Sequence, residues 1–450
     1  MLAKRKKTKT THTSTRREVE ERTVTTIMDL DDSCLQHIFS YINPFKKLRV
    51  QNVCKRWRRL IFHSWVDVTK LKVERFSSFS EFENVLKYCG IGLIEIKLRY
   101  VTSGPACMEI LKIIHKLCPN IKRLDLSDLT LTYRSIEYLA NNFDLRHIAF
   151  TRIHKECEGA LSYFFTKNSK LRSFQTTSDS ILSHCLTYLP ADTLQHFDIS
   201  HYYSKTGMSV EHLKSALIRL KNLKSFSFTC PSEEMQRYDE FLASIHPEAP
   251  LEDIQLNYTH KKKAKKDDKV MLPSLKNLKK LKILHLSGDM IVHDDVMKVV
   301  KSGCKHLEKV DLSNSEFLTD VGLSYITSLP KIKDLNFSHL QLVTDKSFKN
   351  SNMQNLRRLQ IYECKKLRTT GFRKVLESSE VLHSLDVSRC PQVSPKLLKC
   401  WSEEAVAKRG EDGPVLIVRT SCNWAGACDL LTRVSPLLYF YDDKDNDKYY

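Results

Sequence analysis

The sequence is poor in glycine and has no long apolar run. Only 12 of its 450 residues are glycine, and no segment matches GxxxxGK[ST], a Gly-rich dinucleotide turn, GxSxG or HExxH. No apolar run approaches the roughly 20 residues that cross a bilayer, and residues 1–17 are polar and basic rather than like a signal peptide. We therefore expect a non-catalytic protein without cofactor or metal ion, and neither membrane insertion nor secretion.

Cysteine pairs are also missing. The 14 cysteines are scattered singly, with no CxxC pair and no zinc-binding spacing, which predicts reduced and mostly buried thiols in the cytoplasm and/or nucleus. Neighbours such as Cys304/His306 and His293/Asp294 are expected by chance among 17 histidines, so we interpret them as structural.

The net charge of +19 is concentrated in three segments. Residues 1–22 carry eight Lys/Arg against three Glu, residues 46–59 carry seven Lys/Arg and no acid, and residues 260–269 carry six Lys against two Asp. The basic charge thus belongs to a tail, one short motif and one loop. Residues 4–7 and 261–269 are candidate nuclear localisation signals, with plain disordered segments as the alternative.

A pattern apolar-x-x-apolar-x-apolar recurs through most of the chain, about every 26 residues. The copies are Val68/Leu71/Val73, Leu93/Ile96/Leu98, Ile121/Leu124/Leu126, Leu145/Ile148/Phe150, the weaker Leu171/Phe174/Thr176, Leu194/Phe197/Ile199, Leu223/Phe226/Phe228, Leu251/Ile254/Leu256, Leu281/Leu284/Leu286, Leu307/Val310/Leu312, Ile332/Leu335/Phe337, Leu356/Leu359/Ile361 and Leu382/Leu385/Val387, followed by a terminal strand at Leu416/Val418.

Each copy predicts a short strand, because alternating strand residues point to opposite faces and the apolar ones enter a core. Between copies, helical spacing predicts helices over 135–141, 210–220, 294–300, 319–326 and 371–376. Stacked units of this kind predict an α/β fold: a curved solenoid with parallel inner strands and outer helices. The alternative is an ordinary α/β domain with evenly spaced strands.

This pattern resembles the leucine-rich-repeat family, especially its cysteine-containing class. The consensus of that class places Cys three residues after the second apolar strand position, and Cys364 and Cys390 stand there. Most other copies carry a different residue at that position, which predicts an irregular stack.

Ahead of the repeats lie two apolar-patterned segments. Residues 30–42 predict an amphipathic helix with Asp N-cap candidates, and after Asn43-Pro44 residues 48–61 predict a second helix with a basic outer face. Ile38-Phe39-Ser40-Tyr41 and residues 53–60, Val-Cys-Lys-Arg-Trp-Arg-Arg-Leu, make residues 28–66 resemble an F-box, the helical motif that docks on the Skp-class adaptor of SCF ubiquitin ligases. The chain departs from the family at Asp31, Ser33 and Cys34, where Pro, Glu and Ile or Leu are usual.

The resemblance implies a short F-box over residues 27–66, between a disordered basic tail (1–26) and the solenoid (67–420). The solenoid would carry a lysine-rich insertion (260–270), and a C-terminal cap and tail (421–450) would follow it. About forty residues form no stable core alone, so exposed apolar side chains would need a partner. For Trp57, packing inside the motif is an equal alternative. The side chains placed at the adaptor contact by this resemblance are Leu30, Leu35, Ile38, Phe39, Ile42, Leu48, Val50 and Trp57.

The residue between the two apolar strand positions should face out of the inner surface. From Lys97 to Asp386 this row contains four acids and one Lys, which favours a mildly acidic groove for a protein segment and argues against nucleic acid, whose phosphates require Lys/Arg. A solvated face without ligand is the alternative. The candidate substrate-binding residues are Asp198, His285, Asp311, Asn336, Gln360, Tyr362 and Asp386.

The leading hypothesis is a substrate-recognition subunit of an SCF ubiquitin ligase, which binds the Skp-class adaptor, and through it a cullin, with its F-box and a protein substrate with its repeats. The alternatives are a non-degradative F-box scaffold and a nucleic-acid-associated protein that uses the basic segments. The substrate itself is not predicted.

Overall fold

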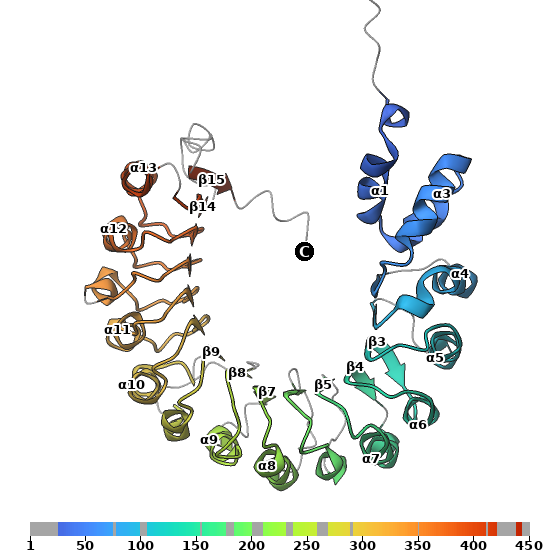
Figure 1. Cartoon of the computed structure of the whole chain (residues 1–450). Coiled ribbons are helices and arrows are strands. Elements are labelled where there is room, and N and C mark those ends of the chain that lie inside the picture. Colours follow the sequence, from blue (N-terminus) through green and yellow to red (C-terminus); the bar gives the residue numbers. More distant parts are fainter. Residues whose placement is uncertain are drawn as a thin grey trace, which may run out of the picture. The chain divides into compact units, whose positions relative to one another are not determined.

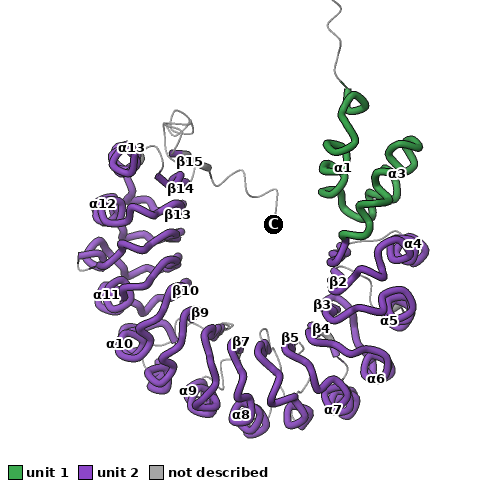
Figure 2. The backbone as a smooth tube through the Cα atoms, viewed as in Figure 1, with its two compact units in different colours: residues 1–67 green, residues 68–450 purple. Residues whose placement is uncertain are grey.

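The computed structural model describes residues 26–74, 78–99, 106–153, 155–176, 184–199, 210–230, 237–258, 269–288, 291–349, 351–410, 413–420 and 438–442. The chain divides into two compact units, residues 1–67 and 68–450 (Figure 2). The basic tail (1–25), most of the lysine-rich insertion (260–268) and the polar C-terminus (443–450) lie outside the described residues.

The first unit is a small helical motif. It consists of a 3₁₀ turn η1 (Ile27–Asp29) and helices α1 (Asp32–Ser40), α2 (Pro44–Val50) and α3 (Lys55–Ser64). The single helix predicted over 48–61 is therefore wrong: the chain turns at residues 51–54 and starts again. Cys54 causes this restart, because its backbone is extended and its Sγ accepts a hydrogen bond from Trp57 N at 3.4 Å, as an N-cap does.

The other two helices of this unit begin at conventional N-caps. Asp31 Oδ1 accepts a hydrogen bond from Cys34 N at 2.7 Å, and Asn43 Oδ1 accepts one from Phe45 N at 2.9 Å, just ahead of Pro44 at the first helical position. The hydrogen bonds from Cys34 N and Ser33 Oγ hold the pKa of Asp31 below its usual range, so the cap stays ionised.

The second unit is built on one sheet of fifteen strands, all parallel and ordered as in the sequence. Its strands are β1 (Lys70–Val73), β2 (Glu95–Leu98), β3 (Arg123–Leu131), β4 (His147–Ile153), β5 (Ser173–Thr176), β6 (His196–Ile199), β7 (Ser225–Cys230), β8 (Asp253–Tyr258), β9 (Ile283–Ser287), β10 (Lys309–Asp311), β11 (Asp334–Asn336), β12 (Arg358–Gln360), β13 (Ser384–Asp386), β14 (Leu416–Thr420) and β15 (Leu438–Asp442).

Helices return the chain between the strands. They are α4 (Phe79–Cys89), α5 (Ala106–Leu117), α6 (Tyr133–Asn142), α7 (Glu158–Lys167), α8 (Val210–Arg219), α9 (Tyr238–Ala243), α10 (Asp294–Gly303), α11 (Asp320–Thr327), α12 (Thr369–Ser378) and α13 (Pro395–Arg409), with the 3₁₀ turns η2 (Gly90–Gly92), η3 (Lys155–Cys157), η4 (His184–Tyr188), η7 (Pro273–Asn277) and η8 (Asp345–Phe348). This unit curves with its strands on the inner side and its helices on the outer side (Figure 1). The predicted α/β solenoid with parallel inner strands is confirmed, and each of the five predicted helices is present.

The predicted strand register is also confirmed. The central apolar residue of each strand pairs with that of the next, as in Leu335 with Leu359 and Leu359 with Leu385. From Leu71 to Val418 every member of this row is at most 2% exposed, so the repeats share one continuous core. In its middle the row becomes aromatic, with the rings of Phe174, Phe197 and Phe226 about 6 Å apart from one to the next.

Polar side chains join neighbouring repeats inside this core. The Cys364 thiol donates to Phe337 O at 3.3 Å and the Cys390 thiol to Ile361 O at 2.9 Å, so each consensus cysteine bonds to the carbonyl that directly follows the preceding strand. Ser315, at the equivalent position, donates from its hydroxyl to Val292 O at 2.6 Å, a carbonyl of the preceding repeat that lies between β9 and α10. A serine can therefore replace the cysteine, which explains why the stack tolerates departures from the consensus.

Strand β15 was not predicted. It pairs in parallel with β14 from Leu416↔Leu438 to Thr420↔Asp442 and so extends the sheet beyond the last predicted strand. No helix among the described residues is long and apolar enough to span a membrane.

Candidate protein-binding surfaces

The predicted adaptor-contact residues of the first unit fall into two groups. Leu35 and Phe39 are 0% and 1% exposed, so both belong to the packed interior. Leu30 and Ile38 are 36% and 39% exposed, and Ile42, Leu48, Val50 and Trp57 are half-buried.

Trp57 is half-buried and contacts the interior of the motif with one side of its ring. Its ring meets that of Phe39 edge-on, with centroids 5.1 Å apart. This contact fixes α3 against α1 and leaves the exposed face of α1 to Ile38.

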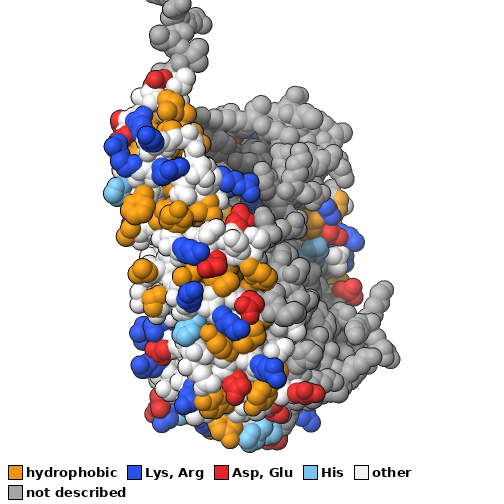
Figure 3. All heavy atoms as spheres, turned by 90° about the vertical axis from the view of Figure 1, so that its right-hand side faces the viewer, with side chains coloured by type: hydrophobic (Ala, Val, Ile, Leu, Met, Phe, Trp, Pro, Cys, Tyr) orange, Lys and Arg blue, Asp and Glu red, His pale blue; other side chains and the backbone are white. Residues whose placement is uncertain are grey.

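Exposed apolar side chains sit among basic ones on this unit. Ile27, Met28, Tyr41, Val53 and Phe62 are 44% to 78% exposed, and helices α2 and α3 hold all seven Lys/Arg of residues 46–59. Figure 3 shows hydrophobic and basic side chains side by side at the top of the view, where this unit lies. Large exposed apolar side chains of this kind are typical of protein-interaction surfaces, so this unit is a candidate binding surface.

Arg56 ties the segment before α1 to α3. Its guanidinium pairs with Asp32 at 2.8 Å and donates to Met28 O at 2.8 Å and Leu30 O at 2.6 Å. The hydrogen bond from Arg56 holds the pKa of Asp32 below its usual range, and Arg59 adds a second ion pair at 3.0 Å. The exposed side chains of Met28 and Leu30 are thereby held in place rather than left on a loose segment.

On the inner face of the second unit, four of the predicted substrate-binding residues meet. His285, Asp311, Asn336 and Gln360 pair in register on β9 to β12 and line one pocket of about 350 Å³. Asp386 stands beside Gln360 on β13, outside the pocket lining, while Asp198 lies on β6, four strands before Asp311.

Asp311 is the centre of this pocket. Its Oδ2 lies 3.2 Å from His285 Nδ1 and accepts a hydrogen bond from Asn336 Nδ2 at 3.0 Å, while Oδ1 accepts one from Ser313 N at 3.0 Å. Burial alone would raise the pKa of Asp311, but the bond and charge of His285 outweigh it and hold that pKa below its usual range. The carboxylate is therefore ionised and its orientation is fixed.

Tyr362 lies apart from this pocket, just beyond the end of β12. Its ring centroid is 5.0 Å from that of His339, and the Arg389 guanidinium lies over it at 5.1 Å. His339 Nδ1 is in turn 3.6 Å from a Glu363 carboxylate oxygen. The backbones of His339, Glu363 and Arg389 have positive φ values of 55° to 62°, so the same turn recurs in successive repeats.

A second row of inner-face residues was missed by the sequence reasoning. Each strand turns two residues inward, and the one that precedes the central apolar position also faces the groove. The alternation of side chains along a strand is sufficient to predict this second row from the sequence. This row consists of Lys70, Glu95, Arg123, His147, Ser173, His196, Ser225, Asp253, Ile283, Lys309, Asp334, Arg358 and Ser384.

The second row changes the charge of the face. It holds four Lys/Arg and three acids, so the two rows together carry five Lys/Arg and seven acids, and the inner face as a whole is less acidic than the first row alone. In the pocket around Asp311, Arg358 pairs with Asp334 through a nitrogen–oxygen contact of 2.5 Å, and Lys309 lies 3.6 Å from the same carboxylate. That pocket is therefore polar and close to neutral.

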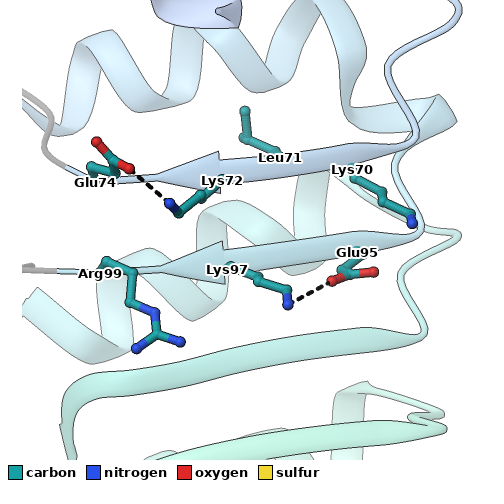
Figure 4. Close-up of a pocket in the computed structure, with 7 residues that line it drawn as sticks. All are labelled: Lys70, Leu71, Lys72, Glu74, Glu95, Lys97 and Arg99. Atoms are coloured by element: carbon teal, nitrogen blue, oxygen red, sulfur yellow. Dashed lines mark ion pairs between the residues drawn. The ribbon is translucent and has the colours of Figure 1, made fainter. Parts of the chain in front are cut away.

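A larger pocket of about 600 Å³ lies at the first two strands. Its lining contains four cations and two acids, which Figure 4 shows along β1 and β2: Lys70, Leu71, Lys72, Glu74, Glu95, Lys97 and Arg99. The ion pairs are Lys72 to Glu74 at 2.8 Å and Lys97 to Glu95 at 3.3 Å. No group of three His, Cys, Asp or Glu side chains among the described residues is placed to hold a metal ion.

Comparison with known proteins agrees with this architecture. Residues 31–69 match the F-box-like family model. F-box/LRR-repeat protein 12 of Homo sapiens is 30% identical over 24% of this chain and 35% of its own length. The Putative RNA-binding protein EEED8.10 of Caenorhabditis elegans is 22% identical over 79% of this chain and 49% of its own length. The chain thus spans about half or less of the length of these relatives.

Among solved structures, a chain in the crystal structure of the Rad7 and Elc1 complex in yeast aligns with 92% of this chain and 94% of its own length, at 15% identity and a TM-score of 0.46. Taken together with the fold, the family match defines the class of protein. The chain joins an F-box-like domain to a leucine-rich-repeat-like solenoid with an all-parallel inner sheet.

Proposed function

We propose that this protein is the substrate-recognition subunit of an SCF ubiquitin ligase, promoting ubiquitination and proteasomal degradation of a protein target. The observation that carries the proposal is the pairing of two surfaces on one chain. An F-box-like unit leaves large apolar side chains exposed to solvent, and a separate solenoid presents a polar inner face. One surface suits the ligase and the other suits the target.

The adaptor contact would be formed by the exposed and half-buried members of the expected set. Leu30 and Ile38 lead it, since 36% and 39% of their surface is open, and Ile42, Leu48 and Val50 extend it. Leu35, Phe39 and Trp57 would act indirectly, by holding α1 against α3. In this proposal the chain is a non-catalytic adaptor, and other subunits of the ligase carry out the ubiquitin chemistry.

For the target, the inner-face pocket around Asp311 is the first candidate contact. Asp386 on the neighbouring strand and Tyr362, which lies apart from the pocket, are further candidates. Its charges are already paired within the chain, so it would select a partner by hydrogen bonding and shape more than by net charge. Reversing the charge of Asp386 should weaken capture of the target, whereas unchanged capture would remove this region from the proposal.

Affinity purification of the full chain from cells tests the proposal. Wild type should recover a Skp-class adaptor and a cullin, and the double variant Leu30→Ala/Ile38→Ala should lose both. A target that accumulates when this variant replaces wild type identifies a substrate receptor. Recovery of the ligase with no stabilised target would instead identify a non-degradative scaffold.

A second candidate is RNA binding, favoured by one observation: the relative that aligns with most of this chain is named a putative RNA-binding protein. About half of that relative lies outside the alignment. Retention of the chain on RNA that is lost with rising salt, without recovery of a cullin, would favour this candidate over the ligase.

A further inference from the structure

The inner face is electrically uneven along the solenoid. Five cations converge on the first three strands or directly after them: Lys70, Lys72, Lys97, Arg99 and Arg123. We name these five residues the N-terminal basic surface. Strands β8 to β13 carry four acids on the same face, Asp253, Asp311, Asp334 and Asp386, against two cations, Lys309 and Arg358.

Two of the three acids near this surface, Glu95 and Asp125, are nearly buried beneath the cations, whereas Glu74 is 66% exposed and pairs with Lys72 at 2.8 Å. The Glu95 carboxylate, whose side chain is 13% exposed, lies 3.3 Å from Lys97 and 3.9 Å from Arg123. Asp125, at 14%, lies 3.2 Å from Arg99 and accepts a hydrogen bond from Ser127 N at 3.1 Å.

The cations remain open to solvent above these acids. The side chains of Lys72, Lys97, Arg99 and Arg123 are 43% to 65% exposed. Lys70 is exposed and forms no ion pair with any described residue. The charge presented to a partner is therefore positive, in line with a local count of five cations against three acids.

We propose that the N-terminal basic surface binds a short acidic segment of the target protein, one that carries two or more carboxylate or phosphoryl groups. Figure 4 shows Lys70, Lys97 and Arg99 on the same face of β1 and β2, around the pocket of about 600 Å³. Three strands at about 4.8 Å spacing span roughly 10 Å, which suits a few residues of extended peptide. This inference rests on the proposed function, because it assumes that the solenoid holds a protein target.

Two features favour an acidic peptide over a nucleic acid. The basic track is short: the central inner-face positions that follow it are Ala149, Gln175 and Asp198, none of which neutralises a phosphate. In addition, no aromatic residue stands among the described inner-face residues of β1 to β3, so bases would find no stacking platform there.

The test uses the purified full chain and a short fluorescein-labelled peptide of alternating Glu and Ser. The same peptide with Gln in place of Glu is the neutral probe. A version of this neutral peptide with phosphoserine in place of Ser carries phosphoryl charge instead of carboxylate charge. An oligouridylate of equal length represents RNA. The variant is Lys70→Glu/Lys97→Glu. The control, Lys112→Glu/Lys116→Glu on the exposed side of α5, changes the net charge by the same amount.

The acidic peptide should bind wild type more tightly than the neutral one, and the surface variant should weaken its binding by about tenfold or more at low salt. The control variant should bind as wild type does. Lys70→Gln/Lys97→Gln, which introduces no negative charge beside Glu95, should show the same direction with a smaller loss. Whichever of the Glu and phosphoserine peptides binds more tightly identifies the preferred source of negative charge.

Equal binding by the surface variant and wild type would overturn the inference, since the peptide would then sit on another basic segment. The inference would also be overturned if oligouridylate bound wild type more tightly than either anionic peptide and the surface variant lost this binding. Recovery of adaptor and cullin is measured on the same proteins: if wild type fails there, the proposed function fails, whereas adaptor recovery without peptide binding rejects only this inference.

Discussion

Two neighbouring residues of α1, Ile38 and Phe39, should behave in opposite ways when truncated. Phe39 is 1% exposed and its ring contacts that of Trp57, so Phe39→Ala removes core packing and should cost about 3–5 kcal/mol of folding free energy in the first unit. Truncation of Ile38, which is 39% exposed, should change stability by only about 0.5 kcal/mol.

The loss of adaptor affinity follows from the same exposures. Full burial of an aliphatic side chain contributes about 1.5–3 kcal/mol, and Leu30 and Ile38 each have 36% to 39% of their surface left to bury. Leu30→Ala/Ile38→Ala should therefore weaken binding by roughly 1.1–2.3 kcal/mol, or about seven- to fiftyfold.

Titration calorimetry with a purified Skp-class adaptor measures this affinity, and thermal unfolding followed by circular dichroism measures stability. Ile218→Ala, which truncates a side chain 55% exposed on α8, is the matched control and should leave both unchanged. The reasoning is refuted if the double variant binds the adaptor as wild type does, or if Phe39→Ala unfolds at the wild-type temperature.

Three further predictions concern the solenoid. The buried Asn168 amide accepts a hydrogen bond from Leu145 N at 2.8 Å, so Asn168→Ala should cost about 1–3 kcal/mol in urea unfolding; an unchanged midpoint would contradict this. Burial raises the pKa of the Cys304 thiol to about 12, so iodoacetamide at pH 8 should label the exposed Cys34 long before Cys304. Mass spectrometry of the labelled peptides measures both rates, and equal labelling rates of the two thiols would disprove the burial of Cys304. The pKa of Asp311 is lower in the folded than in the unfolded chain, so the stabilisation by its carboxylate is present above about pH 4 and is lost as the pH falls through the folded pKa. The difference in urea midpoint between wild type and Asp311→Asn should therefore narrow from pH 5 to pH 3. A constant difference would exclude this contribution of Asp311 to stability.

The repeat architecture could be predicted from sequence because a single strong pattern repeats many times. Each copy puts its apolar residues at the same places, so errors in one copy, such as the weak Leu171/Phe174/Thr176, were corrected by its neighbours, and β5 formed there. Strand β15 was missed because it follows β14 without the leucine spacing and pairs through its backbone.

The first unit was harder to divide into helices. Residues 48–61 keep a helical apolar pattern across the turn, and only the N-cap geometry of Cys54 separates α2 from α3. The helical apolar pattern of residues 30–42 likewise places Leu35, Ile38 and Phe39 on one apolar face of α1. Which of them faces water depends on the packing of α1 against α3, which no local pattern encodes.

On the inner face, the sequence located the strand positions but not the charge that they present. The row that contains Asp125 reads as acidic, yet Asp125 lies under Arg99, and Glu95 lies under Lys97. Long basic side chains extend past short acidic ones and remain in solvent, so the surface carries the sign of the longer side chains. A list of residues by strand position does not contain that information.

The central claim is that the F-box-like unit joins this chain to a ubiquitin ligase. Size-exclusion chromatography with light scattering, on the purified full chain mixed with a purified Skp-class adaptor and cullin, tests it most directly. The account predicts one stable complex of all three proteins, lost with Leu30→Ala/Ile38→Ala and kept with Ile218→Ala. A wild-type chain that elutes alone at micromolar concentration beside an adaptor–cullin complex would contradict it.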